Sequence, residues 1–120
     1  MKIIAVDDER HALSSLKSCI EEVLPDCSLV CFDEPLSALE YAEYNPIDFA
    51  FLDLRMPEMN GMELAKRLQA IDPKIGIAFV TGSTRHEIQA LGLTENDCVF
   101  KPASEKAISN AILRFRKIEK

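Results

Sequence analysis

The fold is decided by the stretch Ile47-Asp48-Phe49-Ala50-Phe51-Leu52, which is almost wholly apolar and runs directly into Asp53. Pro46 precedes this stretch, and a loop rich in Pro, Asn and Gly follows it at residues 56–61. A short apolar run between such breakers is typical of a central parallel strand that is buried on both faces. We therefore expect a strand over residues 47–52, with Asp53 at its carboxyl end.

Short apolar runs alternate with longer helical patterns on both sides of this strand. The other strands are expected at residues 2–6, 28–32, 75–80 and 98–100. Helices are expected to end before Pro25, Pro46 and Pro73, a weaker one to cover residues 85–91 after a cap at Ser83 or Thr84, and a last one to begin at Ser104. Five successive strand–helix units predict an α/β fold with a five-stranded parallel sheet and helices on both faces, because parallel strands need right-handed helical crossovers.

The composition limits the class of protein. The chain has 120 residues, which predicts one domain over residues 1–120, and it carries a net charge of −6. An acidic domain does not bind nucleic acid by neutralising phosphates over its whole surface. No apolar run is long enough to span a membrane, no secretory signal is visible, and the four cysteines form no CxxC pair. We expect a cytoplasmic protein with reduced cysteines, no membrane contact and no direct nucleic-acid binding.

Chemically reactive side chains follow the expected strands. Asp7 and Asp8 come after the first strand, Asp53 after the third, Thr81 after the fourth and Lys101 after the fifth. In parallel α/β sheets ligands bind beyond the carboxyl ends of the strands, so these five residues are the candidate site. Each also has a plainer interpretation: an Asp can cap a helix or end a strand in a turn, Thr favours strands, and Lys is a common surface charge.

The chemistry of this group favours a metal-assisted reaction at phosphorus. Crowded carboxylates repel one another unless one is protonated or a cation binds between them. Oxygen ligands with room for water suit Mg²⁺, and a carboxylate beside a hard cation can attack phosphorus. A cation, a lysine and a hydroxyl group are the expected stabilisers of a transferring phosphoryl group.

These residues lie in four stretches that together resemble one known family. They are Val6-Asp7-Asp8-Glu9, Phe51-Leu52-Asp53-Leu54-Arg55-Met56-Pro57-Glu58-Met59-Asn60-Gly61, Val80-Thr81-Gly82 and Phe100-Lys101-Pro102. From Met1 to the last helix, the chain resembles the receiver domain of response regulators in bacterial-type two-component signalling. The resemblance implies a flavodoxin-like receiver fold with strand order 2-1-3-4-5, and a signalling module rather than an enzyme.

The resemblance also assigns roles at the site. Asp53 would be the phosphoacceptor. Asp7, Asp8, Asp53 and the backbone carbonyl of Arg55 would hold Mg²⁺. Lys101 would pair with a phosphoryl oxygen.

Two further residues and the partners follow from the same resemblance. Thr81 would turn inward to bind the phosphoryl group, and the bond from Lys101 to Pro102 would be cis. The implied partners are a sensor histidine kinase or phosphotransfer protein and a downstream effector, and a homodimer could form on phosphorylation.

The chain departs from the family pattern between Thr81 and Lys101. This stretch is a residue or two shorter than is common, and Cys98 stands three residues before the lysine, where the family usually has an aromatic residue that moves with the threonine. We expect an altered or weakened coupling between the site and the output surface.

Several alternatives compete with the receiver interpretation. A haloacid-dehalogenase-type phosphatase needs a second acid two residues after its nucleophile, and Arg55 occupies that place. The four glycines form neither a P-loop nor a dinucleotide fingerprint. Two alternatives stay open. The chain could be a receiver-like module that binds partners without phosphorylation, or the regulatory half of a longer DNA-binding regulator, for which Arg114-Phe115-Arg116-Lys117 could begin a linker.

Overall fold

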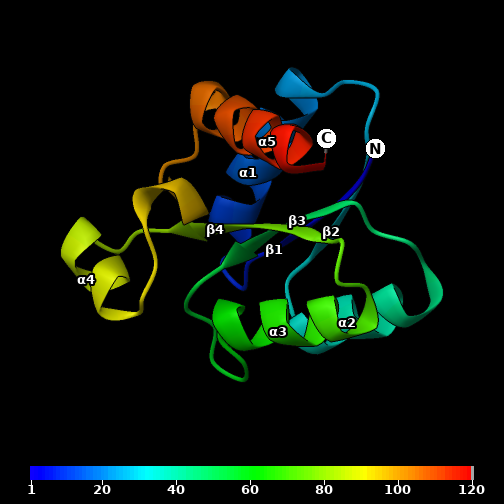
Figure 1. Cartoon of the computed structure of the whole chain (residues 1–120), viewed down its shortest axis with the longest axis horizontal. Helices are drawn as coiled ribbons and strands as arrows, with labels where there is room; N and C mark the ends of the chain where they lie inside the picture. Colours follow the sequence, from blue (N-terminus) through cyan, green and yellow to red (C-terminus); the bar gives the residue numbers. More distant parts are fainter. Residues whose placement is uncertain (120) are drawn as a thin grey trace.

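A computed structural model describes residues 1–119 as one parallel five-stranded sheet with the strand order β2-β1-β3-β4-β5. The elements in chain order are β1 (Lys2–Val6), α1 (Arg10–Val23), β2 (Ser28–Phe32), α2 (Pro35–Tyr44), β3 (Phe49–Asp53), α3 (Gly61–Ile71), β4 (Gly76–Thr81), α4 (Arg85–Ala90), the 3₁₀ turn η1 (Glu95–Asp97), β5 (Cys98–Phe100) and α5 (Glu105–Glu119). Helices α1 and α5 cover one face of the sheet and α2 and α3 the other, while α4 projects beyond one edge (Figure 1). The predicted fold class is therefore confirmed.

Strand β3 is the centre of the molecule, as its sequence predicts. All five of its residues are buried, and its side chains alternate between two cores. Phe49 and Phe51 pack with α1 and α5, whereas Ala50 and Leu52 pack with α2 and α3. The regular strand begins at Phe49 rather than at residue 47, although the Asp48 side chain already accepts a hydrogen bond from the Lys2 backbone N–H at 2.7 Å.

The start of α1 differs from the plainer interpretation of its acidic residues. Neither Asp7 nor Asp8 caps the helix; Glu9 does, through side-chain hydrogen bonds from the backbone N–H groups of His11 and Ala12. The carboxylate of Asp7 accepts instead from the Glu9 backbone N–H at 2.9 Å. Asp7 therefore stays at the end of β1, where it is buried.

A close backbone approach holds the loop after β3 against the strand. The backbone N–H of Gly61, the first residue of α3, donates to the Leu54 carbonyl at 3.0 Å. A Cβ atom at Gly61 would lie 2.3 Å from the Asp53 carbonyl oxygen and 3.1 Å from the Leu54 Cα. Only glycine fits this contact, which fixes the backbone around Asp53.

The segment between β4 and β5 is built from short elements. Helix α4 is capped by Thr84, one of the two predicted caps, and ends at Ala90. Gly92 then takes a φ of 80°, a left-handed conformation that suits glycine, and η1 follows before β5. Within residues 1–119 no helix has the length and apolar character needed to cross a bilayer.

Candidate functional site

The parallel sheet brings the predicted acidic residues to one edge. Asp7 and Asp8 follow β1, and Asp53 is the last residue of the neighbouring strand β3. One carboxylate oxygen from each of the three residues lies within 4.8 Å of the others. Asp7 and Asp53 are buried, whereas Asp8 is exposed and opens the group to solvent.

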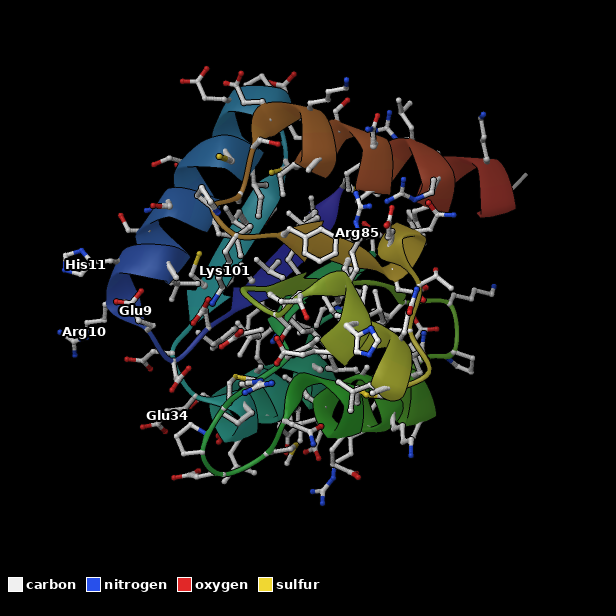
Figure 2. The ribbon with its side chains drawn as sticks, turned by 90° about the vertical axis from the view of Figure 1, so that its left-hand side faces the viewer. Glu9, Arg10, His11, Glu34, Arg85 and Lys101 are labelled. Carbon is white, nitrogen blue, oxygen red and sulfur yellow. The ribbon has the colours of Figure 1, made fainter. Side chains whose placement is uncertain are left out.

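Lys101 completes the group from the end of β5, on the far side of β4. Its Nζ lies 2.9 Å from Asp7 Oδ2 and donates to Asp53 Oδ1 at 3.2 Å. Figure 2, viewed from the side on which α4 lies, shows Lys101 and the α1 cap Glu9 at this edge. The bond from Lys101 to Pro102 is cis, as the resemblance implies. One ammonium group therefore contacts two of the three carboxylates.

The electrostatics of this group follow from burial and crowding. Burial, and then the charge of Asp7, raise the pKa of Asp53 to about 6, against the opposing effect of Lys101. Burial alone would lower the pKa of Lys101, but its hydrogen bonds and charge interactions with Asp7 and Asp53 outweigh that effect and raise it. Lys101 is thus held charged, and it does not neutralise the acidic group.

The charges and donor atoms of this group suit a bound metal ion. Asp7 Oδ2 is fully buried, and its polar contact among the described side chains is the ion pair with Lys101 Nζ at 2.9 Å. The same ammonium also contacts Asp53, so three carboxylates share one positive charge, and a metal ion would balance the remaining negative charge. The donors are all oxygens, and exposed Asp8 leaves room for water, so the residues fit a hard divalent cation such as Mg²⁺.

Thr81 is at the same edge but does not bind the acids. It is the last residue of β4, where its neighbour Val80 pairs with Asp53 in register. Its buried hydroxyl accepts a hydrogen bond from the Ser83 backbone N–H at 2.9 Å. Because a hydroxyl that accepts one bond still has a proton to donate, Thr81 retains a free donor for a ligand.

The side chain of Arg55 binds outside the acidic group. Its Nη2 lies 2.6 Å from Glu87 Oε2 on α4. Arg55, Glu87 and Asp8 line one hollow of about 660 Å³, whose other walls are mostly apolar. Glu87 was not singled out from the sequence, although the spacing Thr84-x-x-Glu87 is that of a capping box and could have drawn attention to it.

A comparison with protein families fits this geometry. The model of the family described as "Response regulator receiver domain" matches residues 3–113. This chain belongs to that family. As a receiver domain it is a signalling module of two-component systems rather than an enzyme, and its acidic cluster is of the type that holds Mg²⁺ in receivers.

The receiver domain is similar to both curated proteins and solved structures. It is 31% identical over 112 residues to "Transcriptional regulatory protein YpdB" of Escherichia coli K12, a match that covers 93% of this chain and 46% of that protein. The chain thus spans about half the length of the curated relatives it matches. A receiver domain from Clostridium thermocellum superposes with a TM-score of 0.75 at 26% identity, covering 99% of this chain and 98% of the other. A CheY-like receiver domain protein from Methanospirillum hungatei, at 22% identity and a TM-score of 0.78, covers 98% and 95% and shares the fold.

Proposed function

We propose that this receiver domain accepts a phosphoryl group from a histidine kinase onto Asp53 and acts as a phosphorylation-dependent switch. The transfer breaks the N–P bond of a phosphohistidine and forms a bond from phosphorus to a carboxylate oxygen of Asp53. The released imidazole keeps the electron pair of the broken bond. The observation that carries the proposal is the convergence of Asp7, Asp8 and Asp53 with Lys101 at one edge of the sheet.

The residues around Asp53 have distinct parts in this transfer. Asp7, Asp8, Asp53 and the backbone carbonyl of Arg55 would hold Mg²⁺, which neutralises the charge that spreads over the phosphoryl oxygens. Lys101, already bonded to Asp53 Oδ1, supplies a second positive charge at the same place. The free proton of the Thr81 hydroxyl is suited to bind a phosphoryl oxygen.

The protonation state of Asp53 limits when it can react. Only the carboxylate is a nucleophile, and burial together with Asp7 raises the pKa of this group to about 6. Without metal, the reactive form therefore falls away as the pH drops below about 6. A bound divalent cation favours the charged form and extends reactivity to lower pH.

The relatives of this chain suggest what the receiver domain controls. Its relatives of about twice the length include proteins named as transcriptional regulatory proteins. We propose that residues 1–120 form a single receiver domain that controls an effector, either on a longer chain of this kind or as a separate partner. A phosphotransfer protein is the alternative donor, and homodimer formation on phosphorylation is an alternative output.

Intact-mass spectrometry tests the phosphoacceptor directly. The chain is incubated with acetyl phosphate and Mg²⁺, and one phosphoryl group adds about 80 Da. Wild type and Asp26→Asn, which changes an exposed acid in the loop after α1, should gain this mass, and Asp53→Asn should not. If wild type gains no mass, a phosphorylation-independent interaction module is the better assignment. Mass gained by Asp53→Asn would place the acceptor elsewhere.

A further inference from the structure

Helix α4 is attached to the rest of the molecule by few contacts. It has six residues, and Ile88 is the one buried residue among them. Helices this short are not stable alone, so their position depends on the contacts they make. Figure 1 shows α4 standing apart from the two layers of longer helices.

Two ion pairs involve α4, and they differ in what they connect. Arg85, labelled in Figure 2, pairs with Glu95 at 2.6 Å, a contact within the same segment between β4 and β5. Glu87 pairs with Arg55 at 2.6 Å, across to the loop after β3. Among the side chains of residues 1–117, this second pair is the only hydrogen bond or ion pair that joins α4 to a part of the chain outside that segment.

Glu87 is held in place independently of Arg55. Its Oε1 accepts from the Thr84 backbone N–H at 3.0 Å, and its own N–H donates to the Thr84 hydroxyl at 3.2 Å. If Arg55 leaves, this capping box keeps the first turn of α4 intact. Loss of the ion pair would therefore release α4 from the loop after β3 while its cap is kept, and a short helix without that support opens more often.

Arg55 also lies close to the acidic site. It lies two residues after Asp53, and it lines the same hollow as Asp8 and Glu87. A phosphoryl group carries nearly two negative charges and three acceptor oxygens, whereas Glu87 offers one charge and one oxygen that is not already bonded to Thr84. Guanidinium groups bind phosphate oxygens in a bidentate fork, so a phosphoryl group on Asp53 is the stronger competitor.

We propose that Arg55 is a positioning residue that carries the state of the acidic site to α4. In the resting domain its guanidinium holds α4 through Glu87. A phosphoryl group on Asp53 draws the guanidinium away, and α4 is released. This inference rests on the proposed phosphorylation of Asp53. It provides a route to α4 that does not need an aromatic residue at position 98, where the chain has a buried cysteine.

Amide hydrogen exchange of α4 measures the release. The backbone N–H groups of Ile88, Leu91 and Leu93 make hydrogen bonds within this segment and report its opening. The site is loaded with Mg²⁺ and beryllium fluoride, which mimics the phosphoryl group. Because exposed ion pairs are weak, loading should raise exchange of these amides by only about 1.4- to 5-fold in wild type.

Three variants separate the ion pair from other effects. In Glu87→Gln, exchange should already be raised before loading, and loading should change it by a clearly smaller factor than in wild type. Arg55→Met should behave in the same way, and combining both changes should add nothing further. Glu95→Gln removes the other ion pair of α4 and should respond to loading as wild type does.

Separate readouts distinguish failure of this inference from failure of the proposed function. Fluorine NMR of the same samples detects bound beryllium fluoride, and its absence overturns both the phosphoacceptor assignment and the inference. With the mimic bound, the inference alone is overturned by unchanged or lower exchange in loaded wild type. It is also overturned if Glu87→Gln responds by the same factor as wild type.

Discussion

Replacing Asp53 by asparagine should stabilise the domain at neutral and alkaline pH in the absence of metal. Burial and the neighbouring Asp7 raise the pKa of Asp53 from 3.8 to about 6, so the folded state binds this proton more tightly than the unfolded chain does. The free energy of unfolding therefore falls as the pH rises from about 4 to about 6 and stays lower above that. Asparagine is nearly the same shape and carries no charge, so the variant avoids this loss.

The size of the effect follows from the pKa of Asp53. One pH unit corresponds to about 1.4 kcal/mol, so a change from 3.8 to about 6 sets an upper limit of about 3 kcal/mol at pH 8. Solvent screening at the open side of the site and the lost hydrogen bond from Lys101 reduce this to about 1–2 kcal/mol. For a domain of this length, that is a rise in Tm of about 4–8 °C.

Urea denaturation of wild type and Asp53→Asn with EDTA, at pH 8 and at pH 4, tests this reasoning. The gain should be present at pH 8 and reduced to a small part at pH 4, where Asp53 is protonated in the folded state and partly protonated in the unfolded chain. Adding Mg²⁺ at pH 8 should stabilise wild type more than the variant and so shrink the gain. A variant less stable than wild type at pH 8, or a gain that is equal at both pH values, would refute the electrostatic explanation.

Three more outcomes are expected. Gly61→Ala should lower the free energy of unfolding by about 1–3 kcal/mol, measured by chemical denaturation, because its Cβ would overlap the Asp53 carbonyl oxygen. Gly82→Ala is the control, since its Cβ meets no atom within 4 Å. Equal losses in the two variants would contradict this cause. Asp8→Asn should weaken Mg²⁺ binding at least about tenfold by calorimetry, since removing a ligand should cost no less than the 10- to 100-fold seen for outer-shell partners; unchanged affinity would put the metal elsewhere. Lys101→Met should raise the pKa of Asp53 further, because Lys101 opposes the effects of burial and Asp7; NMR titration of the carboxyl carbon measures it, and a fall in that pKa would show that the ammonium is not the opposing charge.

The expected weakening of the usual coupling at position 98 stays a prediction. Cys98 is buried, and burial followed by the charge of Asp97 raises the pKa of its thiol to about 11, so it remains a small neutral side chain. It has no ring that could move with Thr81. If α4 still responds to the loaded site, the response must pass through other contacts, of which the Arg55–Glu87 pair is the candidate.

Sequence patterns alone predict the fold class and the residues that form the site. The continuous apolar run of β3 shows that this strand is buried on both faces, because a strand exposed on one side would alternate polar and apolar residues. The helices between the strands require a parallel sheet, and a parallel sheet places the residues after each strand at one edge. The sequence therefore suffices to group Asp7, Asp8, Asp53, Thr81 and Lys101 at one edge of the sheet.

How those groups act on one another follows from contacts that form only when the chain folds. The raised pKa of Asp53 comes from burial and from the approach of Asp7, which is 46 residues away in the chain. The Arg55–Glu87 pair joins the loop after β3 to helix α4, which no local pattern connects. The cap of α1 is Glu9, because Asp7 is held at the end of β1. The spacing of apolar residues in the sequence predicts which side chains face the core, because side chains on one face recur at a fixed interval in each helix and strand. Contacts between exposed side chains of different segments have no such repeat, and they depend on distances that only the folded chain sets.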